Sequence, residues 1–178
     1  MENPNRAPGF RFPASVSRQP KAVECFVAFT LRDARAGDLK TLWQIDQECF
    51  AEGISYSEEE LGYFMTRRGS FTLVAMDDEI QQIQAFIVGY AGAVGHIITI
   101  DVVASARRSG LGSQLLRAAE DRLRAAGKRT MTLETAVDNR AALSFYKRHG
   151  FEIAGTIPGY YADGMDAFFL RKSLASAR

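Results

Sequence analysis

Arg107-Arg108-Ser109-Gly110-Leu111-Gly112 decides the fold, because this stretch joins a strand pattern to a helix pattern. Residues 97–103 before it are apolar and mostly β-branched, which predicts a buried strand. Residues 113–126 after it alternate charged and apolar groups and stop at Gly127, which predicts an amphipathic helix. The apolar residues at helical spacing are Leu111, Leu115, Ala119, Leu123 and Ala126.

The loop between these two elements has the properties of an anion site. Gly110 and Gly112 let a ligand approach the backbone, and the N–H groups that begin a helix have no internal partner. The helix dipole and the charges of Arg107 and Arg108 favour an anion at the same place. The loop therefore predicts a pyrophosphate cradle. A surface turn, with glycines for geometry and arginines for solubility, is the alternative that the loop alone leaves open.

Two common phosphate motifs do not fit this loop. A Walker loop ends in Gly-Lys-Ser/Thr, which is absent, and Leu115 stands where a dinucleotide fingerprint has its third glycine. The remaining pattern, Arg-x-x-Gly-x-Gly at the start of a long helix, resembles the acetyl-CoA-binding motif of the GNAT superfamily of N-acetyltransferases.

A second motif about thirty residues later strengthens the resemblance, which covers roughly residues 26–172. Residues 139–151 are similar to the Asn-x-x-Ala-x-x-x-Tyr-x-x-x-Gly-Phe signature of the same superfamily. The resemblance implies acetyl-CoA as co-substrate, bound in a splay between the central strands, and no metal. The residues that it assigns to the cofactor are Ile100, Asp101, Val102, Arg107, Arg108, Ser109, Gly110, Leu111, Gly112, Ser113, Asn139 and Tyr146.

The hydrophobic patterns predict an α/β chain: a mixed, mostly antiparallel seven-stranded sheet of the GNAT kind, with four helices on its two faces. A single crossover, the basic loop and its helix, joins two parallel strands. The expected strands are 26–32, 71–76, 82–90, 97–103, 129–135, 151–157 and 165–171, and the expected helices are 39–50, 57–67, 111–126 and 140–149.

Composition places the chain among ordinary globular proteins. It has 178 residues, 47% of them apolar and 24% charged, and a net charge of +1, which argues against a general nucleic-acid binder. Two cysteines, Cys25 and Cys49, make neither a disulfide framework nor a zinc site. Without a membrane-spanning run or a signal-peptide core, we expect a cytoplasmic protein, monomeric or homodimeric, with no membrane partner. Residues 1–24 are expected to form a flexible tail and residues 25–175 a single domain.

Glu134 is the candidate general base. It is the one acid in the strand expected at 129–135, where burial would make a carboxylate hold a proton more tightly. Periodicity leaves open that Glu134 faces solvent. The resemblance decides for a base, acting directly or through water. Protein N-terminal acetyltransferases of the ribosomal-protein-alanine type carry Leu-Glu here, five residues before the motif asparagine.

Tyr146 is the candidate general acid, since a phenol is protonated at neutral pH and can donate to a leaving thiolate. Packing beside Phe145 is the structural alternative, and the GNAT motif favours the catalytic role. Asn139 is expected to bond the pantetheine amides, to cap the following helix, or both. A backbone N–H near Val102 is expected to stabilise the oxyanion.

The two histidines carry no catalytic assignment. His96 is interpreted as a strand-end residue, and His149 as a cation suited to the end of a helix.

The acceptor is assigned from two further similarities. Residues 159–170 and the run Tyr56-Ser57-Glu58 resemble the substrate loops of protein N-terminal acetyltransferases, which assigns Tyr56, Tyr160 and Tyr161 to the acceptor. The first hypothesis is therefore transfer to the α-amine of a protein N-terminus. The alternatives are a GNAT acting on a small amine, such as a polyamine, amino acid or antibiotic, and a non-catalytic CoA-binding module.

Overall fold

The computed structural model describes residues 28–50 and 54–175. The expected tail at 1–24, together with Cys25, lies outside the described residues. Among the residues that are described, no helix is long and apolar enough to cross a membrane.

A seven-stranded mixed sheet forms the centre of the described chain, in the order β1-β2-β3-β4-β5-β7-β6. Every neighbouring pair is antiparallel except β4 and β5, which run parallel. The expected sheet is thus confirmed. The strands are β1 (Phe29–Asp33), β2 (Ser70–Asp77), β3 (Gln82–Ala91), β4 (Gly95–Val102), β5 (Thr130–Ala136), β6 (Glu152–Ile157) and β7 (Ala167–Ser173).

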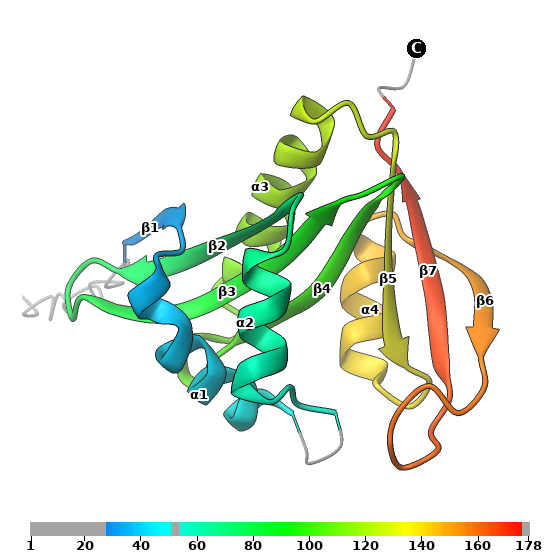
Figure 1. Cartoon of the computed structure of the whole chain (residues 1–178), viewed down its shortest axis with the longest axis horizontal. Coiled ribbons are helices and arrows are strands. Elements are labelled where there is room, and N and C mark those ends of the chain that lie inside the picture. The colour runs from blue at the N-terminus through cyan, green and yellow to red at the C-terminus, as the bar shows by residue number, and fades with distance from the viewer. Residues whose placement is uncertain (1–27, 51–53, 176–178) are drawn as a thin grey trace, which may run out of the picture.

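Four α-helices cover the two faces of the sheet, as expected (Figure 1). They are α1 (Leu39–Cys49), α2 (Glu58–Thr66), α3 (Leu111–Ala125) and α4 (Arg140–Arg148). One core cluster lies between the sheet and α1 and α2, around Leu42, Leu61 and Phe86. The other lies between the sheet and α3 and α4, around Leu115 and Leu133. Amphipathic helices on both faces explain why the central strands are buried on both sides.

Two strands begin two residues away from the expected position, and several other strand boundaries shift by one or two residues. β7 begins at Ala167 rather than at residue 165, because Met165 accepts a backbone hydrogen bond from Tyr161 and Asp166 accepts one from the N–H of Gly159. β4 begins at Gly95, two residues early, because Gly95 and His96 pair with β5.

The pairing of β4 with β5 is very short, and this determines where a ligand can enter. Only Gly95 with Met131 and His96 with Thr132 are partners. Just beyond them β4 carries an extra residue, Ile98, between the positions that pair with β3. A bulge of this kind increases local twist. The two strands therefore separate towards their carboxyl ends, and a gap opens in the middle of the sheet.

Gly95 permits close packing at the last paired step. A Cβ there would lie 2.7 Å from the side chain of Leu123 on α3 and 3.1 Å from the carbonyl oxygen of Thr130. The strands can therefore approach α3 here before they diverge.

Tyr56, in the connection between α1 and α2, is hydrogen-bonded to α1 through both its N–H and its carbonyl group. Its N–H donates to Asp46 Oδ2 at 2.8 Å, and its carbonyl accepts from Gln47 Nε2 at 2.8 Å. The ring of Tyr56 packs edge-on against Phe64, with the ring centroids 5.1 Å apart. The next residue, Ser57, caps α2 in a capping box with Glu60. The loop beside the gap is thus held by helices on both sides.

Asp46 and Asp101 are buried acids on either side of this connection. Asp46 has 0% and Asp101 1% of its surface exposed. Burial raises the pKa of Asp46 from its ordinary 3.8 to about 6, against the hydrogen bonds from Tyr56 and Gln47 that lower it. Burial, with the charge of Asp46 adding to it, raises the pKa of Asp101 well above its usual range. Ionisation of this pair therefore opposes folding.

We predict that Asp46→Asn stabilises the protein in a pH-dependent way. The folded pKa of Asp46 is raised, so its contribution to stability is fully present below pH 4 and is lost as pH rises through about 6. Asparagine keeps an acceptor for Tyr56 and removes the charge. The difference in unfolding free energy between Asp46→Asn and the wild type should therefore grow in favour of the variant, by on the order of 3 kcal/mol, from pH 4 to pH 8.

Urea unfolding at the two pH values measures this difference. Glu152→Gln, which removes an exposed carboxylate on β6, is the matched control for the loss of one negative charge. A gain of equal size at both pH values would contradict the prediction.

Candidate active site

A cavity of about 940 Å³ occupies the gap between β4 and β5. This volume lies near the upper end of the range for small-molecule sites, roughly 300–1,000 Å³. Its wall combines β4 and β5 with the loop before α3, the face of α4 and two tyrosine-bearing loops. The sequence-predicted residues that line it are Tyr56, Ile100, Asp101, Val102, Arg107, Arg108, Gly110, Gly112, Ser113, Glu134, Asn139, Tyr146, Tyr160 and Tyr161.

One end of the cavity is built for an anion. In the described chain, the N–H groups of residues 108–113 have no hydrogen-bond partner, and no side chain caps α3. Gly110 has a φ of 90°, and Arg108 has a φ of 64°, which is strained for a residue with a Cβ. Free N–H groups at the positive end of a 15-residue helix bind anions well. These N–H groups could hold the pyrophosphate that the sequence predicts here.

Three of the predicted cofactor residues, Arg107, Ser109 and Leu111, have side chains that stabilise the loop and the start of α3. Arg107 Nε donates to the carbonyl of Val102 at 3.0 Å, which holds the loop on the end of β4. The Ser109 hydroxyl donates to the carbonyl of Ala106 at 2.6 Å. The side chain of Leu111 is 1% exposed and anchors α3 in the core. Neither Ser109 nor Leu111 lines the cavity, so only their N–H groups could bind a ligand there.

The base of the gap holds a chain of polar groups that the sequence did not predict. Glu134 Oε2 lies 3.2 Å from His96 Nε2, and the Glu134 side chain is only 14% exposed. His96 Nδ1 lies 2.9 Å from Thr132 Oγ1, whose hydroxyl donates to the carbonyl of Gly95 at 3.2 Å. His96 is therefore no mere strand-end residue. It sits behind Glu134 at the point where the two strands part.

The direction of these hydrogen bonds fixes where a proton lies. The single Thr132 hydrogen is used on Gly95, so Thr132 Oγ1 accepts from His96 Nδ1–H. His96 Nε2 then faces a carboxylate oxygen, and one proton between the two makes that contact favourable.

Tyr146 lines the same cavity from α4 and is 7% exposed. Burial, with the negative charge of Asp101 as a second cause, raises the pKa of its phenol well above the ordinary value. Tyr146 is therefore fully protonated at neutral pH and can donate a hydrogen. It packs on Phe145 and Phe151 as well, so the core role and the donor position coexist.

Asn139 and Asp101 each use one side-chain oxygen to accept a hydrogen bond within the protein. Asn139 Oδ1 accepts from the N–H of Ala142 at 3.0 Å and caps α4, which leaves its amide NH₂ for a ligand. Asp101 Oδ1 accepts from the Thr99 hydroxyl at 3.0 Å. Within the described residues its Oδ2 is buried without a partner, and Asp101 is part of the cavity wall.

The three tyrosines that the sequence assigns to the acceptor line the same cavity. Tyr160 and Tyr161, from the loop between β6 and β7, stack edge to face with centroids 5.1 Å apart. Burial, then the charge of Glu134 to which it is hydrogen-bonded, raises the pKa of Tyr160. Burial raises the pKa of Tyr161 to about 12, with Tyr160 and Glu134 adding to it. Tyr56 packs against Phe64 of α2 and also lines the cavity.

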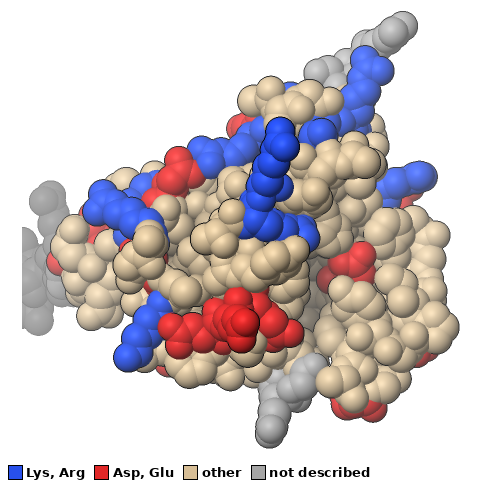
Figure 2. Space-filling view, in the orientation of Figure 1, with Lys and Arg blue, Asp and Glu red and all other residues tan. Residues whose placement is uncertain are grey.

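Acidic side chains are concentrated at the first turn of α2, close in the chain to Tyr56. Glu58, Glu59 and Glu60 form the first turn of α2, directly after Tyr56, and all are exposed. Figure 2 shows red side chains gathered over this end of α2. A negative rim of this kind attracts a cationic amine.

Sequence reasoning missed His96, Thr132 and Cys49. Cys49 is half-buried, donates to the carbonyl of Val102 at 3.4 Å and lines the cavity. For His96 a signal existed: a histidine in one strand and an acid in the strand expected to run parallel to it. The non-catalytic hypothesis required Glu134 or Tyr146 to face away from the cavity, and both line it.

Comparison with known proteins gives the same family. Residues 39–151 match the model described as the acetyltransferase (GNAT) family. The chain is 34% identical over 135 residues to N-alpha-acetyltransferase 30 of Schizosaccharomyces pombe, covering 73% of this chain and 88% of that one. It is 31% identical over 157 residues to N-alpha-acetyltransferase daf-31 of Caenorhabditis elegans, covering 82% of each.

Solved structures agree with the sequence comparison. Ard1 from Thermoplasma volcanium superposes with a TM-score of 0.76 at 26% identity, over 84% of this chain and 100% of that one. The cavity, the uncapped helix and the two sequence motifs thus have one explanation: the chain belongs to the GNAT acetyltransferase family and is an N-acetyltransferase.

Proposed function

We propose that this protein transfers the acetyl group of acetyl-CoA to the α-amino group of a protein or peptide N-terminus. One observation carries the proposal: a single cavity joins the free N–H groups of residues 108–113 to Glu134, Tyr146 and the three tyrosines. The acceptor class is supported by the relatives, whose names are N-alpha-acetyltransferases.

Acetyl-CoA fits the residues present. The N–H groups of residues 108–113 would hold its diphosphate, and the free amide of Asn139 would bond the pantetheine arm. When bound, it supplies a thioester whose acyl carbon can be attacked by an amine. Backbone N–H groups of β4 near Val102 are the candidate donors for the oxyanion.

The proton transfers follow from the positions of three side chains. A protonated amine has no lone pair, so Glu134, with His96 behind it, takes the proton of the acceptor ammonium directly or through water. Tyr146 donates its phenolic hydrogen to the departing sulfur from the other wall. Thr132 keeps the imidazole of His96 oriented by accepting from Nδ1.

A peptide suits the acceptor side better than a small amine. Tyr56 and the pair Tyr160 and Tyr161 come from two loops on different parts of the sheet, and their phenols can bond an extended backbone. Transfer to a small amine stays the second candidate, favoured by the acidic first turn of α2.

We predict that the protein acetylates N-terminal peptides more efficiently than free amines. The measurement is thiol release from acetyl-CoA with a panel of peptides of varied first residues, matched against spermidine, single amino acids and an aminoglycoside. Peptides with a blocked α-amine and a free lysine separate α-amine from side-chain acetylation. Higher kcat/KM for any small amine than for every peptide would reverse the order of the two candidates.

Replacement of the base should be rescued by alkaline pH. We predict that Glu134→Gln lowers kcat/KM at pH 7 by about 10²–10⁴-fold, because proton acceptance is lost. Activity should recover above about pH 8, where a free α-amine deprotonates unaided. His96→Phe should lower activity less, and the double variant should be no worse than Glu134→Gln. Independent, multiplying losses would show that the two groups do not act as a unit.

Replacement of the acid should slow turnover without weakening binding. We predict that Tyr146→Phe lowers kcat at least tenfold while the Kd for CoA, measured by calorimetry, stays within about twofold. Tyr63→Phe, which removes a phenolic oxygen from a residue that is 60% exposed, is the matched control. A weaker Kd with unchanged kcat would remove Tyr146 as the donor.

A further inference from the structure

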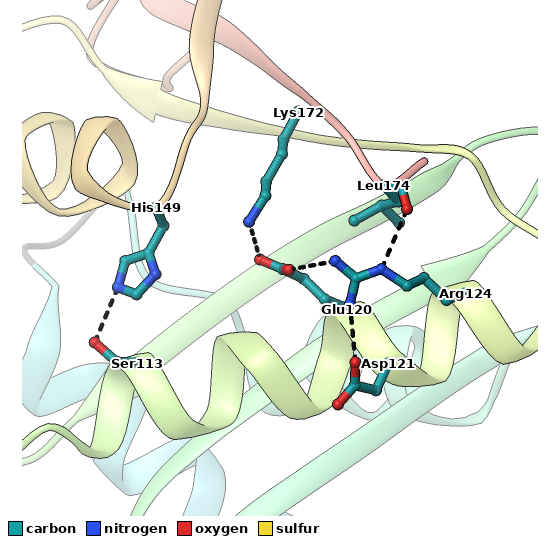
Figure 3. Close-up of polar contacts among 7 residues, drawn as sticks. All are labelled: Ser113, Glu120, Asp121, Arg124, His149, Lys172 and Leu174. Atoms are coloured by element: carbon teal, nitrogen blue, oxygen red, sulfur yellow. Dashed lines mark hydrogen bonds and ion pairs between the residues drawn. The ribbon is translucent and has the colours of Figure 1, made fainter. Parts of the chain in front are cut away.

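A hydrogen bond joins the start of α3 to the end of α4. Ser113 Oγ lies 2.9 Å from His149 Nε2 (Figure 3). Ser113 is the third residue of α3 and lines the anion end of the cavity, whereas His149 lies outside the lining, just after α4. His149 stacks on Phe145 at 4.6 Å between ring centroids, and Phe145 packs on Gly112. Two residues one helical turn apart on α4 thus brace the first turn of α3.

We propose that His149 is a positioning residue that orients the Ser113 hydroxyl towards the diphosphate of CoA. This rests on the proposed function and adds the group that prepares its anion site. A serine hydroxyl has one hydrogen and can also accept. If His149 Nε2–H donates to Ser113 Oγ, the serine hydrogen is free to bond a phosphate oxygen. If Ser113 instead donates to a bare Nε2, none is left for the anion. A bound diphosphate therefore selects the arrangement in which His149 donates.

The charges around His149 indicate how pH acts on this arrangement. Burial, then the positive charge of Lys172, lowers the pKa of His149; Arg117 and Arg148 act in the same direction and Glu120 opposes them. This corrects the expectation that His149 is a cation suited to the helix end. Lys172 bonds Glu120, which also binds Arg124 at 3.0 Å, and Arg124 donates to the carbonyl of Leu174 (Figure 3). The cation beside His149 is thus fixed in place.

A diphosphate one hydroxyl away has the opposite effect on His149. Negative charge favours the imidazolium, so the bound state holds its proton more strongly than the free state. Binding then takes up part of a proton, and affinity rises as pH falls through the pKa of His149. In either protonation state of the complex, Nε2 remains the donor.

The test is the Kd of 3′-dephospho-CoA, measured by calorimetry on the full chain between pH 6 and pH 8. This ligand keeps the diphosphate and lacks the 3′-phosphate, whose own ionisation near pH 6 would confuse the profile. His149→Phe and Ser113→Ala should each weaken binding about fivefold, as expected for one hydrogen bond. The double variant should be no weaker than either single one.

His149→Gln separates the hydrogen bond from the titration. Its side-chain NH₂ can replace Nε2–H, so affinity at pH 8 should return to within about twofold of the wild type, without the tightening that the wild type shows towards pH 6. Pantetheine, which lacks the diphosphate, should bind all variants equally in NMR titrations. Should His149→Phe fail to fold, as judged by circular dichroism, the glutamine variant and its pH profile decide.

Three results would overturn the positioning role. They are losses that multiply in the double variant, a pH dependence of His149→Gln like that of the wild type, and a loss of pantetheine binding equal to that of 3′-dephospho-CoA. Failure of the wild type to bind 3′-dephospho-CoA at all would instead reject the proposed function, so the two failures are distinct.

Discussion

The early end of hydrogen bonding between β4 and β5 is the constraint on which the site depends. Two residue pairs hold the strands together, and the bulge at Ile98 then turns β4 away. Backbone groups that would pair in a continuous sheet face a cavity instead, so polar main chain becomes available to a ligand without unfolding anything. The cores on the two faces of the sheet keep this opening stable, because each half of the sheet is packed against helices of its own.

The two ends of the cavity rely on different kinds of group, main-chain dipoles at one end and polar side chains at the other. At the anion end most of the field comes from main-chain dipoles and an uncapped helix, and in our proposal His149 adds one oriented hydroxyl. At the other end, the proposed proton transfers use the side chains of Glu134 and Tyr146, with His96 beside Glu134. Binding and chemistry are therefore set by separate parts of the chain, and variants can change one without the other.

The sequence predicted the architecture because each piece is specified locally. Hydrophobic period identified the helices and strands, the capping box identified the start of α2, and the arginine and glycine loop identified the one parallel crossover. Most predicted site residues line one cavity for the same reason, since both motifs sit at the carboxyl ends of neighbouring strands.

Contacts between distant segments could not be read in this way. The pairing of His96 with Glu134 depends on the register of β4 against β5, and a strand start misplaced by two residues hid it. The mutual influence of Asp46 and Asp101 depends on how α1 packs on the sheet. The contact of Ser113 with His149 depends on where two helix ends meet. Each is a property of packing, which no spacing along the chain encodes.

The uncapped start of α3 also affects how the enzyme releases its product, CoA. CoA carries the same diphosphate before and after the acetyl group leaves, so main-chain amides that grip one form grip the other equally well. Discrimination between acetyl-CoA and CoA must therefore come from the thioester end of the cofactor. There the acetyl group is either present or absent in the space between β4 and β5. In the proposed binding mode, tight binding of the diphosphate at the start of α3 therefore implies inhibition by the product CoA.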